Sequence, residues 1–307
     1  MKVLLNLTGE GPNWLQQSRE TEGVIKAILD TQVAVNQLYL RLHKVPALYH
    51  AGIRYREEPL NVLRLGGHST ADSVEEFANV PAVIERGWGD GDDIVPWRCA
   101  ELREHGELAK IRLEPHGNKC HVVLRRGDGT KEDPCAKLGM TDLPAPLQRT
   151  AGKFLLNLTG ESRNWLAHSR ELAPVIKMIL ETQVAINQLY IRLHKVPPIY
   201  RSGIRYREEP MNLLRLGRQR PEAVEEFACI PAIIERGWDD CDGIGPWRCA
   251  ELRHHGEKAK IRLTWRRHPQ TGQKIFHVVV RRGNGDVEDP CAKLGMPTGS
   301  VERQLGL

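Results

Sequence analysis

The chain lacks several features that define common classes of protein. No apolar run reaches the roughly 18 residues that a membrane-spanning helix needs. The 44 lysine and arginine residues are mixed with 39 aspartate and glutamate residues and form no basic tail, so specific nucleic-acid binding is not expected. The first residues have neither the apolar core nor the small-residue cleavage site of a signal peptide, which predicts synthesis and folding in the cytoplasm.

Metal-binding and disulfide-rich classes are also disfavoured. The seven cysteines are an odd number and include no Cys-x-x-Cys pair, which argues against a zinc ribbon and against a complete disulfide framework. His105 and the adjacent His254 and His255 lack the spacing of metal ligands and lie near the end of an expected helix, where they favour its dipole. The sequence therefore predicts neither a metal site nor a cofactor.

The chain contains an internal sequence repeat, in which one unit occurs twice in tandem. The segment 2–10 returns at 153–161 with a single change, at an offset of 151 residues. The offset falls to 150 after a one-residue deletion near Arg218 and rises to 156 after six residues are inserted before His277. A period of this length matches a whole domain and is too long for a solenoid repeat.

The duplication predicts two tandem domains, residues 1–147 and 148–307. The segment 141–146 between them contains two prolines, which suit a short, semi-rigid linker.

The order of the expected elements predicts an α+β fold for each domain. In the first repeat, apolar residues at helical spacing indicate a long helix over about 20–43, which Pro46 ends. The second repeat has the same pattern, ended by Pro197. A Gly-Asn-Gly-Asp turn at 283–286 separates two runs that are typical of antiparallel strands. Helices followed by an antiparallel sheet are typical of the α+β class.

Three residues of the second repeat are candidates for chemistry. Cys241 stands where a loop enters a helix, and the unpaired N–H groups and positive dipole end of a helix start favour a thiolate. His277 falls on an expected strand and Asp289 on its partner strand, so Asp289 could orient the imidazole that takes the thiol proton. The backbone N–H of Cys241 and groups near Trp238 are candidates for stabilising an oxyanion.

The first repeat has the same pattern without its nucleophile. His121 and Asp133 stand at the histidine and aspartate positions, but Gly91 stands at the position of Cys241. Glycine has no nucleophilic group, so the first repeat is predicted to be a degenerate, non-catalytic site.

Five motifs of the second repeat form a recognisable pattern. They are Asp240-Cys241-Asp242, Trp247-Arg248-Cys249-Ala250-Glu251-Leu252, His277-Val278-Val279, Glu288-Asp289-Pro290 and the run from Tyr200 to Tyr206. These motifs resemble the transglutaminase-like cysteine-hydrolase superfamily, whose fold is related to that of papain. The likeness covers most of each repeat and is closest to a branch found in tailed-bacteriophage genomes among virion or tail-associated proteins.

The resemblance implies two tandem transglutaminase-like domains, with Cys241 as nucleophile, His277 as general base and Asp289 as the residue that orients it. It also implies a structural protein of the virion, at the tail, neck or capsid. Such a protein is made in the cytoplasm of a host bacterium and packs against other virion proteins in a symmetric assembly. The second domain could keep peptidase, amidase or acyl-transfer activity. The alternative is an active cysteine hydrolase that acts on a peptide or cell-wall-like substrate and is not a particle component.

The second repeat departs from the family pattern beside its cysteine. Gly243 stands where the family has a second aspartate, which the first repeat keeps as Asp93. Pro96 and Pro246 stand where a small, helix-compatible residue is usual. The motif is therefore partly eroded, which leaves open a domain that is kept for its shape and not for turnover.

Two cysteine pairs recur in both repeats. Cys99 with Cys135, and Cys249 with Cys291, could form a helix-to-strand disulfide in each domain if the protein leaves the reducing cell. Buried free thiols are the favoured alternative.

Overall fold

The computed structural model of the protein describes helices, strands and their connections in stretches along the chain. The described residues are 2–7, 21–57, 62–65, 72–73, 75–116, 119–141, 153–158, 172–209, 212–216, 222–267 and 274–297. The predicted domain boundary at residue 147 and most of the linker at 141–146 lie outside the described residues.

The chain divides into two compact units, and their boundaries do not follow the repeat. Unit 1 comprises Met1–Leu5, Asn13–Leu172 and Met211–Glu226, and unit 2 comprises Asn6–Pro12, Ala173–Pro210 and Phe227–Leu307. Unit 1 therefore contains strands of the second repeat in addition to most of the first repeat.

A seven-stranded sheet accounts for this division. In chain order its strands are β1 Lys2–Asn6, β3 Val62–Leu65, β4 Asp72–Ser73, β5 Glu75–Ala78, β10 Lys153–Asn157, β12 Asn212–Leu216 and β13 Glu222–Ala228. Their order in the sheet is β4-β3-β12-β13-β1-β10-β5. The last three strands in chain order come from the second repeat, so strands of the two repeats are interleaved. Except for the C-terminal ends of β1 and β13, the sheet belongs to unit 1.

The first strand of the second repeat lies beside a strand of the first repeat. β10 pairs with β5 in parallel, with Phe154–Asn157 aligned with Glu75–Ala78. The rings of Phe154 and Phe77 approach to 5.9 Å between centroids. The three apolar residues of β10 are all buried, as expected for a strand that is covered on both faces. β1 in turn lies next to β13 of the second repeat, so the repeats exchange their first strands.

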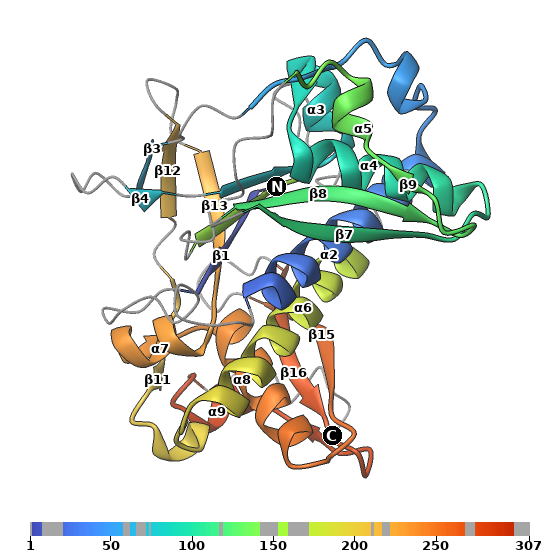
Figure 1. Cartoon of the computed structure of the whole chain (residues 1–307). Helices are drawn as coiled ribbons and strands as arrows, with labels where there is room; N and C mark the ends of the chain where they lie inside the picture. Colours follow the sequence, from blue (N-terminus) through green and yellow to red (C-terminus); the bar gives the residue numbers. More distant parts are fainter. Residues whose placement is uncertain are drawn as a thin grey trace. The chain divides into compact units, whose positions relative to one another are not determined.

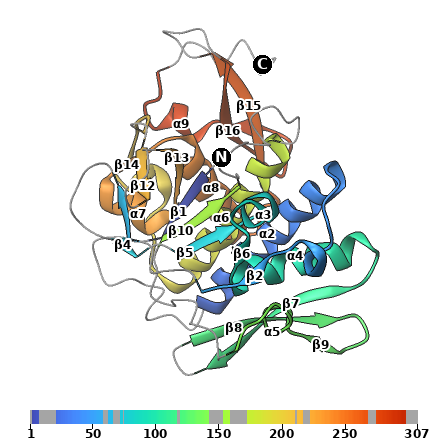
Figure 2. The same ribbon diagram turned by 90° about the horizontal axis from the view of Figure 1, so that it is seen from above.

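In the rest of unit 1, two helices pack together and a hairpin lies along them (Figures 1 and 2). Helix α2 (Thr21–Leu42) packs against α4 (Gly91–Glu104), and the antiparallel strands β7 (Ala109–His116) and β8 (Lys119–Arg126) contact this pair. The shorter elements are η1 Leu48–His50, β2 Arg54–Tyr55, α3 Val80–Arg86, β6 Trp88–Gly89, β9 Lys131–Glu132 and α5 Pro134–Lys137. The long helix predicted over 20–43 is α2.

Two buried polar side chains join α2 to the strand and helix that lead to the site. Gln32 Nε2 donates to the carbonyl oxygen of Ala78 (2.5 Å), at the end of β5. Asn36 Oδ1 accepts from the N–H of Val80 (3.0 Å), at the start of α3. Apolar residues at helical spacing cover the rest of this face of α2, so these two bonds fix its position along the strand.

Unit 2 contains the corresponding elements of the second repeat. Its main elements are α6 Leu172–Leu193, α8 Cys241–His254, β15 Lys260–Arg267 and β16 Lys274–Arg281, and the β15–β16 hairpin packs against α8. Gln183 and Asn187 of α6 form the same two hydrogen bonds, to Ala228 and Ile230. The shorter elements are η2 Ile199–Arg201, β11 Arg205–Tyr206, α7 Ile230–Arg236, β14 Trp238–Asp239, β17 Val287–Glu288 and α9 Pro290–Lys293.

The α+β class predicted from the sequence is confirmed. In each unit helices precede an antiparallel sheet, β7-β8-β9 in unit 1 and β15-β16-β17 in unit 2. None of the helices in the described parts of the chain is long and apolar enough to cross a membrane. The sequence did not predict the interleaved sheet. The repeat indicates that a strand forms at β10, but it does not indicate which strand β10 pairs with.

The pairing of β10 with β5 can be tested by a double-mutant cycle on Phe77 and Phe154. Each Phe→Ala change is expected to lower the free energy of unfolding by about 3–5 kcal/mol, because each ring is buried. The double variant should show a coupling of about 0.5–1.5 kcal/mol, measured by chemical denaturation. Leu108→Ala, at a side chain that is 76% exposed, is the control and should change stability by less than about 0.5 kcal/mol. Strict additivity of the two phenylalanine variants would contradict the pairing.

Candidate functional site

Cys241 is the first residue of α8, as the sequence predicts. Asp240 is the N-cap of this helix, and its side chain accepts a hydrogen bond from the N–H of Asp242 (3.1 Å). The preceding helix α7 ends at Arg236, and its C-cap Gly237, with a positive φ of 74°, turns the chain into β14 and towards the cysteine. Cys241 is 9% exposed and therefore lies at the edge of the protein interior.

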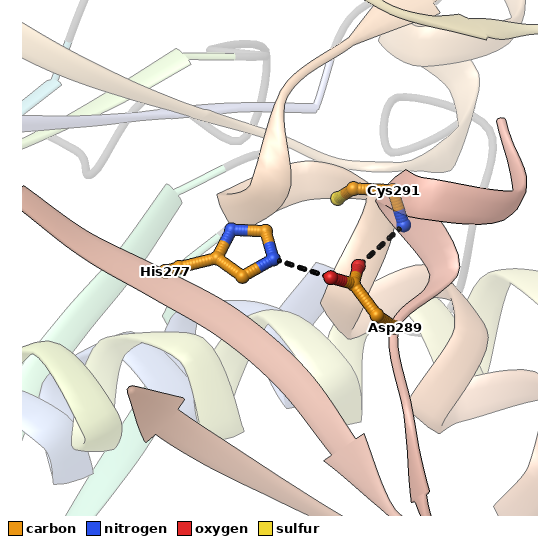
Figure 3. Close-up of side chains that lie close together, drawn as sticks. All are labelled: His277, Asp289 and Cys291. Atoms are coloured by element: carbon orange, nitrogen blue, oxygen red, sulfur yellow. Dashed lines mark hydrogen bonds and ion pairs between the residues drawn. The ribbon is translucent and has the colours of Figure 1, made fainter. Parts of the chain in front are cut away.

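His277 and Asp289 are joined by a hydrogen bond of 3.0 Å between Nε2 and Oδ2 (Figure 3). His277 lies on β16, which pairs with β15 on one side and with β17 on the other. Asp289 follows β17 and is the N-cap of α9, so it is not itself on the strand as expected. Its other oxygen, Oδ1, accepts from the N–H groups of Cys291 (3.0 Å) and Ala292 (3.2 Å). Both carboxylate oxygens are therefore engaged, which fixes the orientation of the histidine ring.

This hydrogen bond determines which imidazole nitrogen can act as a base. A carboxylate only accepts, so Nε2 of His277 carries the donated proton and Nδ1 carries the lone pair. The ring is fully buried, and within the described residues Nδ1 has no hydrogen-bond partner. His277 and Asp289 are thus brought together by a bond, whereas no hydrogen bond joins Nδ1 to the Cys241 thiol. In proteins without substrate, such contacts are often longer than in the reacting complex.

The first repeat keeps the same pair without a thiol. His121 Nε2 and Asp133 Oδ2 lie 2.8 Å apart, and Asp133 caps α5 as Asp289 caps α9. Burial raises the pKa of Asp133, but the hydrogen bond from His121 and the bonds from backbone N–H groups outweigh it and lower the pKa. A Cβ at Gly91 would lie 3.8 Å from Val122 Cβ and 4.0 Å from Cys135 Sγ, which are ordinary contacts. The first repeat therefore has glycine at the position of Cys241, with space for a side chain.

The cysteines of the two recurring pairs are buried thiols. Within the described residues, Cys99, Cys135, Cys249 and Cys291 are free, so the two possible disulfides are not formed. Burial raises the pKa of all four thiols, to about 11 for Cys99 and about 12 for Cys249. After burial, the electrostatic effect of the neighbouring Cys241 contributes most to the raised pKa of Cys291. Thiols with raised pKa values in apolar surroundings are poor nucleophiles.

Trp238, on the short strand β14 before Cys241, lies close to two arginines. The guanidinium carbons of Arg236 and Arg207 lie 4.7 and 4.9 Å from its ring centroid, at cation–π distance. Arg236 Nε also donates to the carbonyl oxygen of Trp238 (3.0 Å). The loop before Cys241 is therefore held by its own side chains. The oxyanion role predicted for this region stays a prediction.

In the second repeat, the carboxylate of Asp239 occupies the space that a side chain at position 243 would need. A Cβ at this position would be 1.8 Å from Oδ2 of Asp239, which is fully buried. In the first repeat the buried carboxylate is that of Asp93, and burial raises its pKa while Arg86 opposes the shift. The glycine that indicated an eroded motif in the sequence is therefore matched by a carboxylate four residues earlier.

Glu288, which the sequence motifs placed beside the site without a role, is the centre of a cluster of ion pairs. It accepts hydrogen bonds from Tyr200, from Arg248 (Nε, 2.9 Å) and from Lys293 (3.0 Å). Burial raises the pKa of Glu288, but these bonds outweigh it and lower the pKa to about 2. Because Arg248 belongs to α8 and Glu288 immediately precedes Asp289, the cluster links the cysteine helix to the histidine–aspartate pair. Glu132 forms the equivalent cluster in the first repeat.

Several donor groups lie close enough to suit a metal ion. The ligand atoms of His277, Asp289 and Cys291 are within 4.8 Å of one another, as are those of two carboxylate groups, Asp90, Asp92 and Asp93 in unit 1 and Asp239, Asp240 and Asp242 in unit 2. The His277–Asp289 hydrogen bond, the helix caps and the arginine pairs account for several of these contacts. The prediction that the chain has no metal or cofactor stays a prediction.

No protein-family model matches the chain, and neither a curated protein nor a solved structure shows significant similarity to it. The transglutaminase-like resemblance therefore remains an expectation from the sequence motifs.

The Glu288 cluster predicts a pH-dependent stability. Ionised Glu288 contributes stability that is fully present above its ordinary pKa near 4.5 and is lost as the pH falls towards 2. Glu288→Gln should therefore lower the free energy of unfolding by about 3 kcal/mol at pH 7 and by much less at pH 2.5, as measured by urea denaturation. Glu85→Gln, on the exposed face of α3, is the control and should change stability by less than about 0.5 kcal/mol at both pH values. An equal loss at both pH values for Glu288→Gln would show that the charge is not what stabilises this region.

Proposed function

We propose that the second repeat is a cysteine-dependent acyl-transfer or hydrolysis site, with Cys241 as nucleophile, His277 as general base and Asp289 orienting the base. The observation that carries the proposal is the His277–Asp289 hydrogen bond, which leaves Nδ1 as the basic nitrogen of a buried ring. This ring lies on β16, which packs against the helix that begins with Cys241. The substrate class that suits this chemistry is an amide, in a peptide or in a cell-wall-like polymer.

In the proposed reaction, Nδ1 of His277 takes the thiol proton of Cys241, and the sulfur attacks the carbonyl carbon of the amide. The backbone N–H of Cys241 and groups near Trp238 stabilise the negative charge on the tetrahedral intermediate. The proton on Nδ1 passes to the leaving amine as the C–N bond breaks, which leaves a thioester on Cys241. Water or a second amine, which gives a proton to Nδ1, then attacks the thioester carbonyl carbon. The C–S bond breaks, Cys241 takes the proton back from Nδ1, and the product is a carboxylic acid or a new amide.

A structural role in the virion of a tailed bacteriophage is the second candidate, for the chain as a whole. It is favoured by the first repeat, which keeps its His121–Asp133 pair although Gly91 offers no nucleophile. The interleaved sheet also supports a role in which both repeats act as one structural unit. Both repeats would then be transglutaminase-like building blocks that contact other virion proteins in a symmetric assembly, and the second could still be active.

Thiol labelling tests the enzymatic proposal. Iodoacetamide at neutral pH is expected to modify Cys241 on the order of tenfold faster than Cys99 or Cys249, because burial raises the pKa of those two thiols. Mass spectrometry of peptides from the native protein would give the rate at each cysteine. Equal rates at Cys241 and the buried cysteines would contradict the proposal.

Three variants sharpen the labelling experiment. Cys241→Ser should remove the fast site, and His277→Ala should slow labelling at Cys241 by about a hundredfold or more. Gly91→Cys should create a second fast site, because the first repeat keeps His121 hydrogen-bonded to Asp133 and has room for the side chain. A slow, ordinary thiol at position 91 would show that the pair alone does not activate a cysteine in this fold.

The structural role predicts a fixed copy number in purified particles. Quantitative mass spectrometry should find the chain at a constant ratio to the major capsid protein after density-gradient purification. Absence from the particles, or a ratio that falls with each purification step, would contradict the role.

A further inference from the structure

Corresponding positions in the two repeats hold the same two residue types in opposite order. The first repeat has Gly89 and Asp93, whereas the second has Asp239 and Gly243. Both carboxylates are fully buried, although they start from backbone positions that differ by four residues. Each repeat therefore buries one carboxylate of this pair of positions, but the carboxylate belongs to the later residue in the first repeat and to the earlier residue in the second.

The two carboxylates bind the arginine that ends the short helix before the site. Asp93 accepts a hydrogen bond from Nη2 of Arg86, and Asp239 accepts one from Nη2 of Arg236. In each repeat the same arginine donates from Nε to the carbonyl oxygen of the tryptophan two residues later, at 2.9 and 3.0 Å. In each repeat one arginine thus binds both the tryptophan carbonyl oxygen and a buried carboxylate.

Side-chain volume explains why the two residue types are exchanged. A Cβ at Gly243 would lie 1.8 Å from Oδ2 and 2.6 Å from Cγ of Asp239, so a side chain and this carboxylate exclude each other. At Gly89 a Cβ would lie 3.2 Å from Cβ and 3.3 Å from Oδ2 of Asp93. In each repeat the glycine has no side chain, and the carboxylate four residues away fills the space beside it. The second repeat has no room for aspartate at both positions.

In the second repeat this contact lies directly before the cysteine. Oδ1 of Asp239 accepts from the N–H of Asp240 (2.8 Å), and Asp240 is the N-cap of the helix that begins with Cys241. Arg236 binds the same stretch of backbone at Trp238. The Arg236–Asp239 pair therefore sets the path of the three residues that lead to the nucleophile.

We infer that Asp239 is a positioning residue for Cys241 and supplies the carboxylate that the sequence motif places at position 243. The inference rests on the proposed function, because it concerns the residue proposed as nucleophile. Gly243 then marks a relocated carboxylate and not an eroded site.

Four forms of the full-length chain test this inference: wild type, Asp239→Gly, Gly243→Asp and the double variant. Asp239→Gly removes the fully buried carboxylate that binds Arg236 and the N–H of Asp240, although Arg236 keeps its bond to Glu209 (2.9 Å), so it should lower Tm by about 5 °C or more. It should also slow iodoacetamide labelling at Cys241 by about tenfold. Gly243→Asp should lower Tm at least as far, because its side chain collides with Asp239. The double variant rebuilds the arrangement of the first repeat and should regain most of the lost Tm and labelling within about threefold of wild type.

The reciprocal exchange in the first repeat, Gly89→Asp with Asp93→Gly, is the matched control. It should also recover Tm relative to Asp93→Gly, without changing the labelling rate at Cys241. A double variant in the second repeat that is no better than Asp239→Gly would overturn the relocated carboxylate. Recovery of Tm without recovery of labelling would overturn the positioning role. The ratio of rates between variants can be read even if wild-type Cys241 is a slow thiol, an outcome that would refute the proposed function alone.

Discussion

Backbone hydrogen bonds between β5 and β10 are the constraint on which the rest of unit 1 depends. β10 is buried on both faces, so its apolar residues need a sheet that its own repeat does not supply alone. β5 leads directly into α3, and α3 leads through β6 into α4, whose first residue is Gly91. The strand that accepts β10 therefore also determines where the loop before the site begins. Gln32 and Asn36 anchor α2 at this same junction, so the helix layer and the sheet share one point of attachment.

At the site itself, one carboxylate meets two structural requirements. Asp289 caps α9 with one oxygen and orients His277 with the other, and Asp133 does the same for α5 and His121. The capping requirement does not depend on which residue stands at position 91. This gives a physical reason for a histidine–aspartate pair to persist where Gly91 can do no chemistry: the aspartate also stabilises a helix start.

The features that could be predicted from the sequence are those with a local signal. The start of α8 at Cys241, the β16–β17 turn and the long helix α2 follow from capping residues, turn residues and helical spacing. The proximity of His277 and Asp289 follows from that turn. The partner of β10 has no local signal, because an apolar strand that is buried on both faces fits any open edge. Gly243 shows the same limit of a local signal: a glycine shows that a side chain is missing, but not that Asp239 fills its space. The Glu288 cluster likewise joins residues up to 88 positions apart in the chain.

The exchange of first strands makes the covalent connection between the repeats part of the stability of the fold. β10 pairs with β5, and β1 lies between β13 and β10. The seven-stranded sheet therefore forms only when strands of both repeats come together. On one polypeptide this encounter is intramolecular, so it does not depend on protein concentration. If the same two sequences were on separate chains, the sheet would form only by association, and its stability would depend on protein concentration. The segment between the repeats thus contributes to the stability of the sheet, because it keeps the two repeats on one chain.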